Sequence, residues 1–390
     1  MVEVNHNDLK WAIERCRNEQ VSLYVAGPSG IGKSESVWTT EIAKAKELSR
    51  EFRSWDSFTI EEKEKLATEE EYVALFYIGA DLRGSTMQET DLGGLPDFTK
   101  NKEFVEFKPR LLGKVFSMKR VAGFLFFDEI NQAPKGVQNG LFKTIQDRSI
   151  GDCKVNQSIL IIGAGNRIED RASITNMSGP LATRFMQFEL LCPSADEYIE
   201  YNLNSPYPNP SITGFLKSYS DHVYQFNPSG KELAFPNPRS IQRLAKFMSA
   251  MPMATEADIK KVEIIAKASC GVPWGNKFVA YARMARKVDV DSILNHPEDI
   301  KKHVGQLDLK YSIISAIAYK CRDKFKDTIE PALMVMNELD EESGVFGLRV
   351  IKQFVGDTKL KGHLRKSVAW DKHLSVRFGP FLKFDDTEQV

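Results

Sequence analysis

The stretch Val21-Ser-Leu-Tyr-Val-Ala-Gly-Pro-Ser-Gly-Ile-Gly-Lys-Ser34 joins an apolar run directly to a Gly-x-x-x-x-Gly-Lys-Ser loop. Residues 21–26 have the composition of a buried strand, and residues 35–50 are suited to a helix. A glycine-rich turn at the start of a helix gathers backbone N–H groups and the positive end of the helix dipole on one side, where they can bind phosphate. The stretch therefore predicts a phosphate-binding loop.

The residues of this loop have different expected roles. The glycines allow the backbone angles that the turn requires. Lys33 would place its ammonium on the β- and γ-phosphates of a nucleotide, and Ser34 would offer its hydroxyl to a Mg²⁺ ion that bridges these phosphates. The loop residues expected to contact the nucleotide are Gly27, Pro28, Ser29, Gly30, Ile31, Gly32, Lys33 and Ser34.

A second apolar run, residues 121–127, ends in two adjacent carboxylates, Asp128 and Glu129. A continuous apolar run predicts a parallel strand that is buried on both faces, and ligands of such sheets bind at the carboxyl ends of the strands. Packing explains two acids poorly here, because isolated buried carboxylates are costly. We expect Asp128 to hold the Mg²⁺ ion and Glu129 to polarise the water that attacks the γ-phosphate.

Three further polar residues follow or precede expected elements. Asn166 comes after the apolar run 158–164. If that strand neighbours the strand ending at Asp128, the Asn166 amide could hold the attacking water or a γ-phosphate oxygen. Arg184 immediately precedes the apolar run 185–190, and Arg239 lies at the start of an expected helix.

The ordered motifs from Gly27 to Arg239 resemble the AAA+ ATPase superfamily and, within it, the MoxR-like and dynein-related branch. The segment Phe-Asp-Glu-Ile-Asn-Gln-Ala-Pro at 127–134 carries the resemblance to the branch, whereas Gly-Asn-Arg at 165–167 departs from the Asn-Pro of some relatives. The resemblance covers about residues 1–290. It implies a P-loop NTPase fold, ATP and Mg²⁺ as cofactors, and a ring, usually a hexamer, with nucleotide between subunits.

The same resemblance assigns roles to single residues and to partners. Its assignments are Walker A for residues 27–34, Walker B for Asp128 and Glu129, sensor 1 for Asn166, an arginine finger for Arg184 and sensor 2 for Arg239. Relatives often work with a von Willebrand factor A domain protein, so the resemblance implies a protein client or partner of that kind.

The spacing of apolar runs predicts an α/β core with a parallel five-stranded sheet flanked by helices. Its expected strands lie near 21–26, 72–79, 121–127, 158–164 and 185–190, and Asn7 is the expected cap of a first helix. The predicted domains are a nucleotide-binding core at 1–194 with insertions at about 49–71 and 81–119, an all-helical lid at 195–295, and a helical C-terminal region of unassigned role at 296–390.

Composition limits the class of protein. The 390 residues suffice for two or three domains, and 53 Lys and Arg balance 53 Asp and Glu, so no overall charge draws the chain to nucleic acid or membrane. The 5 cysteines are odd in number and form no Cys-x-x-Cys pair, which is typical of reduced thiols inside a cell. No run approaches the roughly 20 apolar residues that span a bilayer. A cytoplasmic protein without a membrane segment is expected.

Two segments leave alternatives open. Residues 90–116 combine turn-forming residues with apolar ones, so they predict either a client-contacting insertion or a loop packed over the sheet edge. Residues 359–383 contain 7 Lys or Arg interleaved with aromatic residues. They predict a solvated face or a subunit interface, with nucleic-acid contact as the less favoured interpretation.

The sequence as a whole predicts an ATP-hydrolysing AAA+ protein of MoxR-like type that acts as a ring-shaped remodeller of a protein partner. Two alternatives stay open. One is a nucleotide-gated switch or scaffold with slow hydrolysis, which lacks partner-stimulated turnover. The other is a DNA-acting ATPase, which would show strongly salt-dependent DNA binding.

Overall fold

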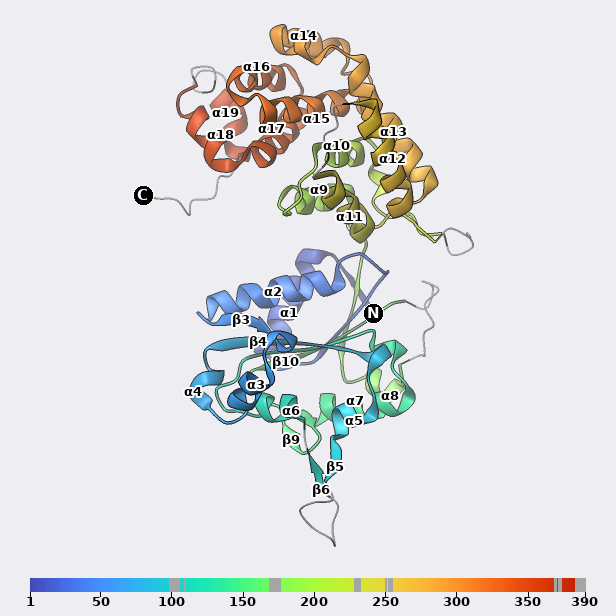
Figure 1. Cartoon of the computed structure of the whole chain (residues 1–390), viewed down its shortest axis with the longest axis vertical. Helices are drawn as coiled ribbons and strands as arrows, with labels where there is room; N and C mark the ends of the chain where they lie inside the picture. The colour runs from blue at the N-terminus through green and yellow to red at the C-terminus, as the bar shows by residue number, and fades with distance from the viewer. Residues whose placement is uncertain are drawn as a thin grey trace. The chain divides into compact units, whose positions relative to one another are not determined.

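The computed structural model describes residues 1–97, 106–108, 110–167, 177–227, 233–249, 251, 255–367, 370 and 374–382. The chain forms two compact units, Met1–Cys192 and Pro193–Val390. The first contains the β-sheet, and the second is built from helices (Figure 1).

The first unit is built on a seven-stranded sheet with the order β1-β11-β2-β10-β7-β4-β3, in which every pairing is parallel. Its strands are β1 (Val2–Val4), β2 (Leu23–Ala26), β3 (Glu51–Ser54), β4 (Phe76–Arg83), β7 (Gly123–Asp128), β10 (Ile159–Gly165) and β11 (Met186–Leu190). All five expected strands are present, as β2, β4, β7, β10 and β11. Because β10 pairs with both β2 and β7, the carboxyl ends of these three strands are neighbours.

The prediction of a five-stranded sheet was wrong, because β1 and β3 extend the sheet at its two edges. β1 has only 3 residues, too few to show a periodic pattern. β3 lies in the charged segment 49–71, and its residues are exposed or half-buried. An edge strand pairs on one side only and can stay polar, so neither strand produces an apolar run.

Helices cover both faces of this sheet, with α1 (His6–Asn18) and α2 (Lys33–Glu47) on one face and α6 (Leu111–Phe116) and α7 (Lys135–Gln146) on the other (Figure 1). The cap of α1 is Asn5, whose side chain accepts from the N–H groups of Asn7 and Asp8. The predicted cap, Asn7, was therefore wrong by two residues. The remaining short helices of the unit are α3 (Ile60–Leu66), α4 (Glu70–Val73), α5 (Glu89–Gly93) and α8 (Gly179–Ala182).

The segment 81–119 packs partly on the core and partly away from it. Leu92 in α5 and Leu112, Val115 and Phe116 in α6 are buried in the hydrophobic core of the first unit. Between these helices, β5 (Leu95–Asp97) and β6 (Glu106–Lys108) form an antiparallel hairpin that extends away from the sheet (Figure 1). Residues 98–105 and 109 lie outside the described residues. A second small ribbon joins β8 (Ser149–Ile150) to β9 (Cys153–Lys154).

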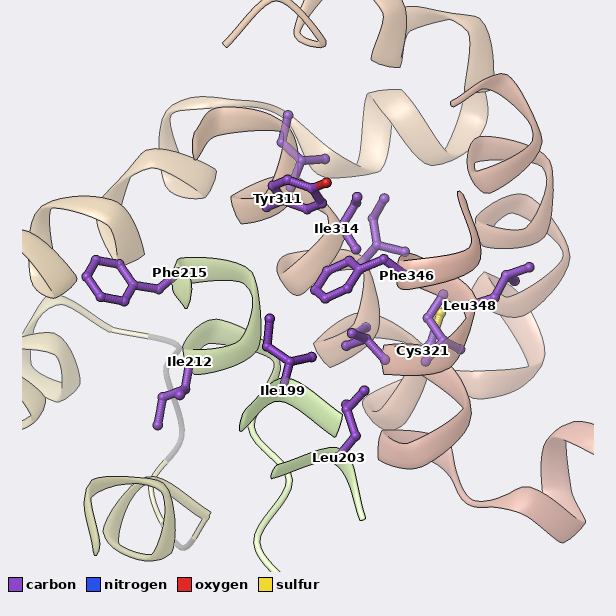
Figure 2. Packing of buried hydrophobic residues seen from close by; sticks show 14 of the residues in the cluster. Ile199, Leu203, Ile212, Phe215, Tyr311, Ile314, Cys321, Phe346 and Leu348 are labelled. Carbon is purple, nitrogen blue, oxygen red and sulfur yellow. The ribbon is translucent and has the colours of Figure 1, made fainter. Parts of the chain in front are cut away.

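The second unit packs its helices around one hydrophobic cluster that runs from Ala195 to Leu382. Figure 2 shows part of it, including Leu203, Ile314 and Phe346. Its helices are α9 (Ala195–Leu203), α10 (Pro210–Ser218), α11 (Pro238–Ser249), α12 (Glu256–Cys270), α13 (Val272–Met284), α14 (Val290–Asn295), α15 (Leu307–Asp323), α16 (Phe325–Glu338), α17 (Glu341–Val355), α18 (Asp357–Leu364) and α19 (Ser375–Phe378). The division into a lid and a C-terminal region stays a prediction.

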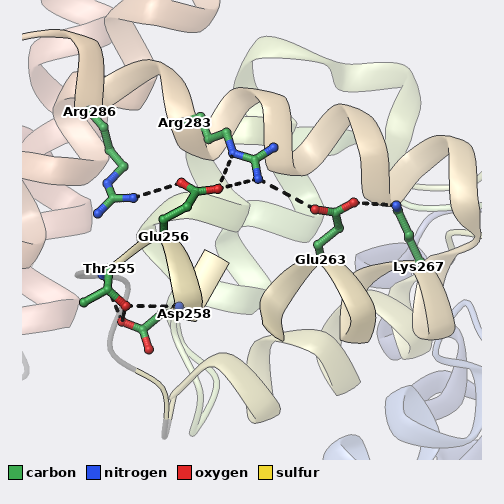
Figure 3. A network of polar contacts seen from close by, with 7 residues as sticks. All are labelled: Thr255, Glu256, Asp258, Glu263, Lys267, Arg283 and Arg286. Carbon is green, nitrogen blue, oxygen red and sulfur yellow. Dashed lines mark hydrogen bonds and ion pairs between the residues drawn. The ribbon is translucent and has the colours of Figure 1, made fainter. Parts of the chain in front are cut away.

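Polar contacts on the surface of this unit join α12 to α13. Arg283 pairs with both Glu256 and Glu263, Arg286 pairs with Glu256, and Lys267 pairs with Glu263 (Figure 3). These charges are partly exposed, so each pair adds little to stability, about 1 kcal/mol or less.

Part of the basic, aromatic segment 359–383 contributes to packing. Phe378 is fully buried, and Arg377 donates to the carbonyl oxygens of Asn337 and Leu339. Lys372 and Lys383 lie outside the described residues. Within the described ranges, none of the helices has the length and apolarity needed to cross a membrane.

Candidate nucleotide-binding site

The loop between β2 and α2 has positive φ at three glycines, Gly27, Gly30 and Gly32. Gly27 has φ +153°, and a side chain there would begin 2.8 Å from the carbonyl oxygen of Leu190. Gly32 has φ +99° and forms the N-cap of α2. Because glycine has no side chain, no capping side chain accepts from the N–H groups of the first turn of α2. Such N–H groups can bind an anion.

Lys33 is held inside this loop. Its side chain is nearly buried, and its Nζ donates to the carbonyl oxygens of Gly27 at 2.7 Å and Pro28 at 2.8 Å. The same Nζ donates to Oδ1 of Asn166 at 3.0 Å. The ammonium group of Lys33 therefore joins the loop to the carboxyl end of β10, where phosphate oxygens could replace some of these acceptors.

Ser34 meets Asp128, the last residue of β7. The Ser34 hydroxyl donates to Oδ2 of Asp128 at 3.1 Å, while Oδ1 of Asp128 accepts from the N–H of Glu129 at 2.9 Å. A hydroxyl and a carboxylate are oxygen ligands of the kind Mg²⁺ prefers, but they are only two. Among the described residues, no group of three or more His, Cys, Asp or Glu is placed to hold a metal. The pair thus fits a Mg²⁺ ion that binds together with nucleotide phosphates and water.

Glu129 has a constrained backbone and side chain. Its φ is +52°, in the left-handed region that residues other than glycine seldom adopt and that is enriched at functional sites. Its Oε2 accepts from the Ser85 hydroxyl at 2.6 Å. Ser85 lies in the 3-10 turn η2 (Gly84–Thr86), directly after β4. Sequence reasoning missed Ser85, because it ended this strand at residue 79 rather than at Arg83.

Asn131 ties the end of β10 to the turn that follows β7. It lies in the 3-10 turn η3 (Ile130–Gln132), and its Nδ2 donates to the main-chain oxygen of Asn166 at 2.7 Å. Its Oδ1 is buried and has no hydrogen-bond partner among the described residues. Sequence reasoning assigned no role to Asn131, although a polar residue close to two candidate catalytic acids was a usable signal.

A third acid, Asp81, lies close enough to Asp128 to interact with its charge, and it belongs to β4, the strand beside β7. Burial and, next, the negative charge of Asp128 raise the pKa of Asp81 to about 6, with Arg83 acting in the opposite direction. β4 and β7 are adjacent in parallel register, with Arg83 opposite Asp128. Several carboxylates therefore lie at or near the carboxyl ends of the strands beside the loop, and a bound cation would stabilise their charged forms.

Of the two arginines singled out from the sequence, Arg184 belongs to the first unit and Arg239 to the second. Arg184 follows α8, and its guanidinium lies 3.8 Å from the ring centroid of Phe142 and donates to the side-chain oxygen of Gln146 at 2.6 Å. Both partners belong to α7, so the Arg184 side chain lies against that helix. Arg239 is exposed near the N-terminus of α11, in the second unit. The roles predicted for both arginines stay predictions.

Comparisons with known proteins give only partial likenesses. No protein-family model and no curated protein matches the chain. RuvB from Thermotoga maritima, a Holliday junction branch migration motor, is 16% identical over 74% of this chain and 74% of that chain, with a TM-score of 0.31. NtrX from Brucella abortus, in complex with ADP, is 15% identical over 71% of this chain and 63% of that chain, with a TM-score of 0.32. Likenesses this low carry no argument about function, which rests on the residues of the chain itself.

Proposed function

We propose that this protein binds ATP with Mg²⁺ and hydrolyses it, as an AAA+ ATPase. The observation that carries the proposal is the meeting of three strand ends. Lys33 bonds to Asn166, Ser34 bonds to Asp128, and Glu129 follows Asp128 on the same edge of the sheet. A phosphate-binding loop, an oxygen pair that suits Mg²⁺ and an adjacent carboxylate are the components that phosphoryl transfer to water requires.

Each residue has a distinct part in the proposed reaction. The N–H groups at the start of α2 and the Lys33 ammonium bind the β- and γ-phosphates. Ser34 and Asp128 hold Mg²⁺, which neutralises charge on the phosphates when it is bound. Glu129 polarises the attacking water, and Asn166 positions that water or a γ-phosphate oxygen.

The finer part of the proposal is a ring-forming remodeller of MoxR-like type, a hexamer by its resemblance, that acts on a protein client. The segment 127–134 supports the branch. In this proposal Arg184 acts on the nucleotide of a neighbouring subunit, and Arg239 senses nucleotide from the helical lid. A partner with a von Willebrand factor A domain remains part of the proposal.

The Ser85–Glu129 bond favours a second candidate, a nucleotide-gated switch with slow hydrolysis. The Ser85 hydroxyl donates to Oε2 of Glu129 at 2.6 Å and so occupies an oxygen that could otherwise accept a hydrogen bond from the attacking water. Release of Glu129 would then control turnover. The two candidates differ in whether a protein partner accelerates steady hydrolysis.

Two variants test the proposal. We expect Lys33→Ala to abolish nucleotide binding, measured by calorimetry with ADP and Mg²⁺, because the loop loses its buried cation. We expect Glu129→Gln to bind ATP normally and to lose at least about 100-fold in turnover, because the general base is removed. Lys46→Ala, an exposed lysine near the end of α2, is the matched control. Wild-type turnover in Glu129→Gln would exclude the base assignment.

A further inference from the structure

A histidine outside the sequence motifs contacts the phosphate-binding loop. Nε2 of His6 lies 2.9 Å from the carbonyl oxygen of Ile31. Because a carbonyl oxygen can only accept, Nε2 carries the hydrogen in this contact. The ring also lies against Gly32, where an added Cβ would be 3.4 Å from Nε2. His6 therefore packs on the peptide between Ile31 and Gly32, just before α2.

The position of His6 is fixed on both sides. Before it, β1 pairs with β11, and the carbonyl oxygen of Val4 accepts from the N–H of Leu191 at 3.0 Å. His6 is also the first residue of α1, and the side chain of Asn5 caps that helix. The contact with Ile31 thus ties the loop to the N-terminal strand and helix of the unit.

The direction of this bond matters for phosphate binding. In a planar trans peptide the carbonyl oxygen and the next N–H point in opposite directions. When His6 holds the Ile31 carbonyl oxygen, the N–H of Gly32 is directed to the other side of the same peptide. Polarisation of that carbonyl also makes the N–H of its peptide a stronger donor.

We infer that His6 is a positioning residue that orients the Ile31–Gly32 peptide so that its N–H donates to a nucleotide phosphate. The inference rests on the proposed function, because it assumes that the loop binds nucleotide. His6 itself touches no reacting atom. It acts through the peptide, and its loss should weaken phosphate binding in the ground state and the transition state equally.

Three substitutions at His6 separate the hydrogen bond from packing. His6→Leu keeps apolar bulk without a donor. His6→Gln places an amide N–H near the position of Nε2, and His6→Asn places one about a bond shorter, out of reach of Ile31. Lys10→Ala, an exposed residue of α1, is the control for changes on this helix.

The experiment measures the Kd for ADP with Mg²⁺ by calorimetry and the KM and kcat for ATP. We expect His6→Leu and His6→Asn to raise Kd and KM about fivefold, the size of one neutral hydrogen bond, with kcat within about twofold of wild type. His6→Gln should restore both constants to within about twofold of wild type. If His6→Leu fails to fold, the pair His6→Asn and His6→Gln carries the same test.

Several results would overturn the inference. Wild-type Kd in both His6→Leu and His6→Asn would show that the bond does not serve binding. Equal loss in His6→Gln and His6→Asn would show that the donor is not the cause, and a fall in kcat at unchanged KM would place His6 elsewhere in the reaction. Failure of wild-type protein to bind ADP would instead overturn the proposed function, and this inference with it.

Discussion

At the scale of single residues, the base of the proposed reaction is held in a strained and restrained state. Glu129 has a left-handed backbone, its N–H donates to Asp128, and its carboxylate accepts from Ser85. A left-handed residue other than glycine costs of order 1–3 kcal/mol and persists only where its surroundings impose it. The bond to Ser85 therefore selects one orientation of the Glu129 carboxylate.

We predict that Ser85→Ala raises basal ATP turnover. The substitution removes a hydrogen bond of ~1 kcal/mol from the carboxylate, which corresponds to about a fivefold increase in rate if that bond must break before water is activated. Nucleotide affinity should not change. Steady-state phosphate release measures the effect, with Thr86→Ala in the same turn as control. A slower Ser85→Ala enzyme would mean that Ser85 orients the base productively.

Asp81 predicts a pH dependence of stability in the absence of Mg²⁺. Its folded-state pKa is about 6 against an ordinary value of 3.8. Between these two values the folded state binds more protons than the unfolded state, so this carboxyl group lowers stability as pH rises from about 4 to 6. The full shift corresponds to ~3 kcal/mol, and partial solvent access reduces the expected effect to ~1 kcal/mol.

Asp81→Asn removes this titration. We expect the variant to exceed wild type in free energy of unfolding by ~1 kcal/mol at a pH of about 7.5 and by much less at a pH of about 4.5, because wild-type Asp81 is protonated at the lower pH. Urea denaturation at the two pH values, with EDTA present, measures the difference. An advantage of equal size at both pH values would contradict the assigned pKa.

At the scale of elements, burial decides what the sequence reveals. β7 and β10 lie in the middle of the sheet and are buried on both faces, so their apolar runs predict them and place Asp128 and Asn166 at their ends. Edge strands lack such runs, and β1 and β3 were missed. The contacts of Ser85 and His6 join segments that are distant in sequence, and no local pattern indicates such contacts.

The hairpin of β5 and β6 gives a prediction at this scale. Because α5 and α6 bury their apolar residues while the hairpin extends from the unit, replacing residues 98–105 by Asn-Gly should preserve both fold and basal hydrolysis. The thermal midpoint and basal ATPase rate measure this. Leu112→Ala, in the buried part, should instead cost about 2–4 kcal/mol of stability. Loss of basal activity in the shortened variant would assign the hairpin to the site.

At the scale of the whole molecule, Arg184 is the residue proposed to act on the nucleotide of a neighbouring subunit. Its side chain lies against α7, whereas the cation of the phosphate-binding loop itself is Lys33. Arg184 contacts Phe142 and Gln146, and it also donates to the carbonyl oxygen of Pro180. None of these partners is a carboxylate, so none of them neutralises the guanidinium charge of Arg184. An arginine held by uncharged partners at the surface of the core is suited to an anion supplied by another subunit.

We predict that Arg184→Ala binds ATP but hydrolyses it at least about 1,000-fold more slowly, since an arginine supplied in trans contributes roughly 10³–10⁵ in rate. Lys33→Ala should be inactive for a different reason, because it fails to bind nucleotide. Mixing the two inactive proteins should restore part of the activity, because some interfaces then combine an intact loop with an intact arginine. Gln146→Ala, which removes only the partner of Arg184, should stay active. No recovery in mixtures whose subunits demonstrably exchange would exclude a role of Arg184 in trans.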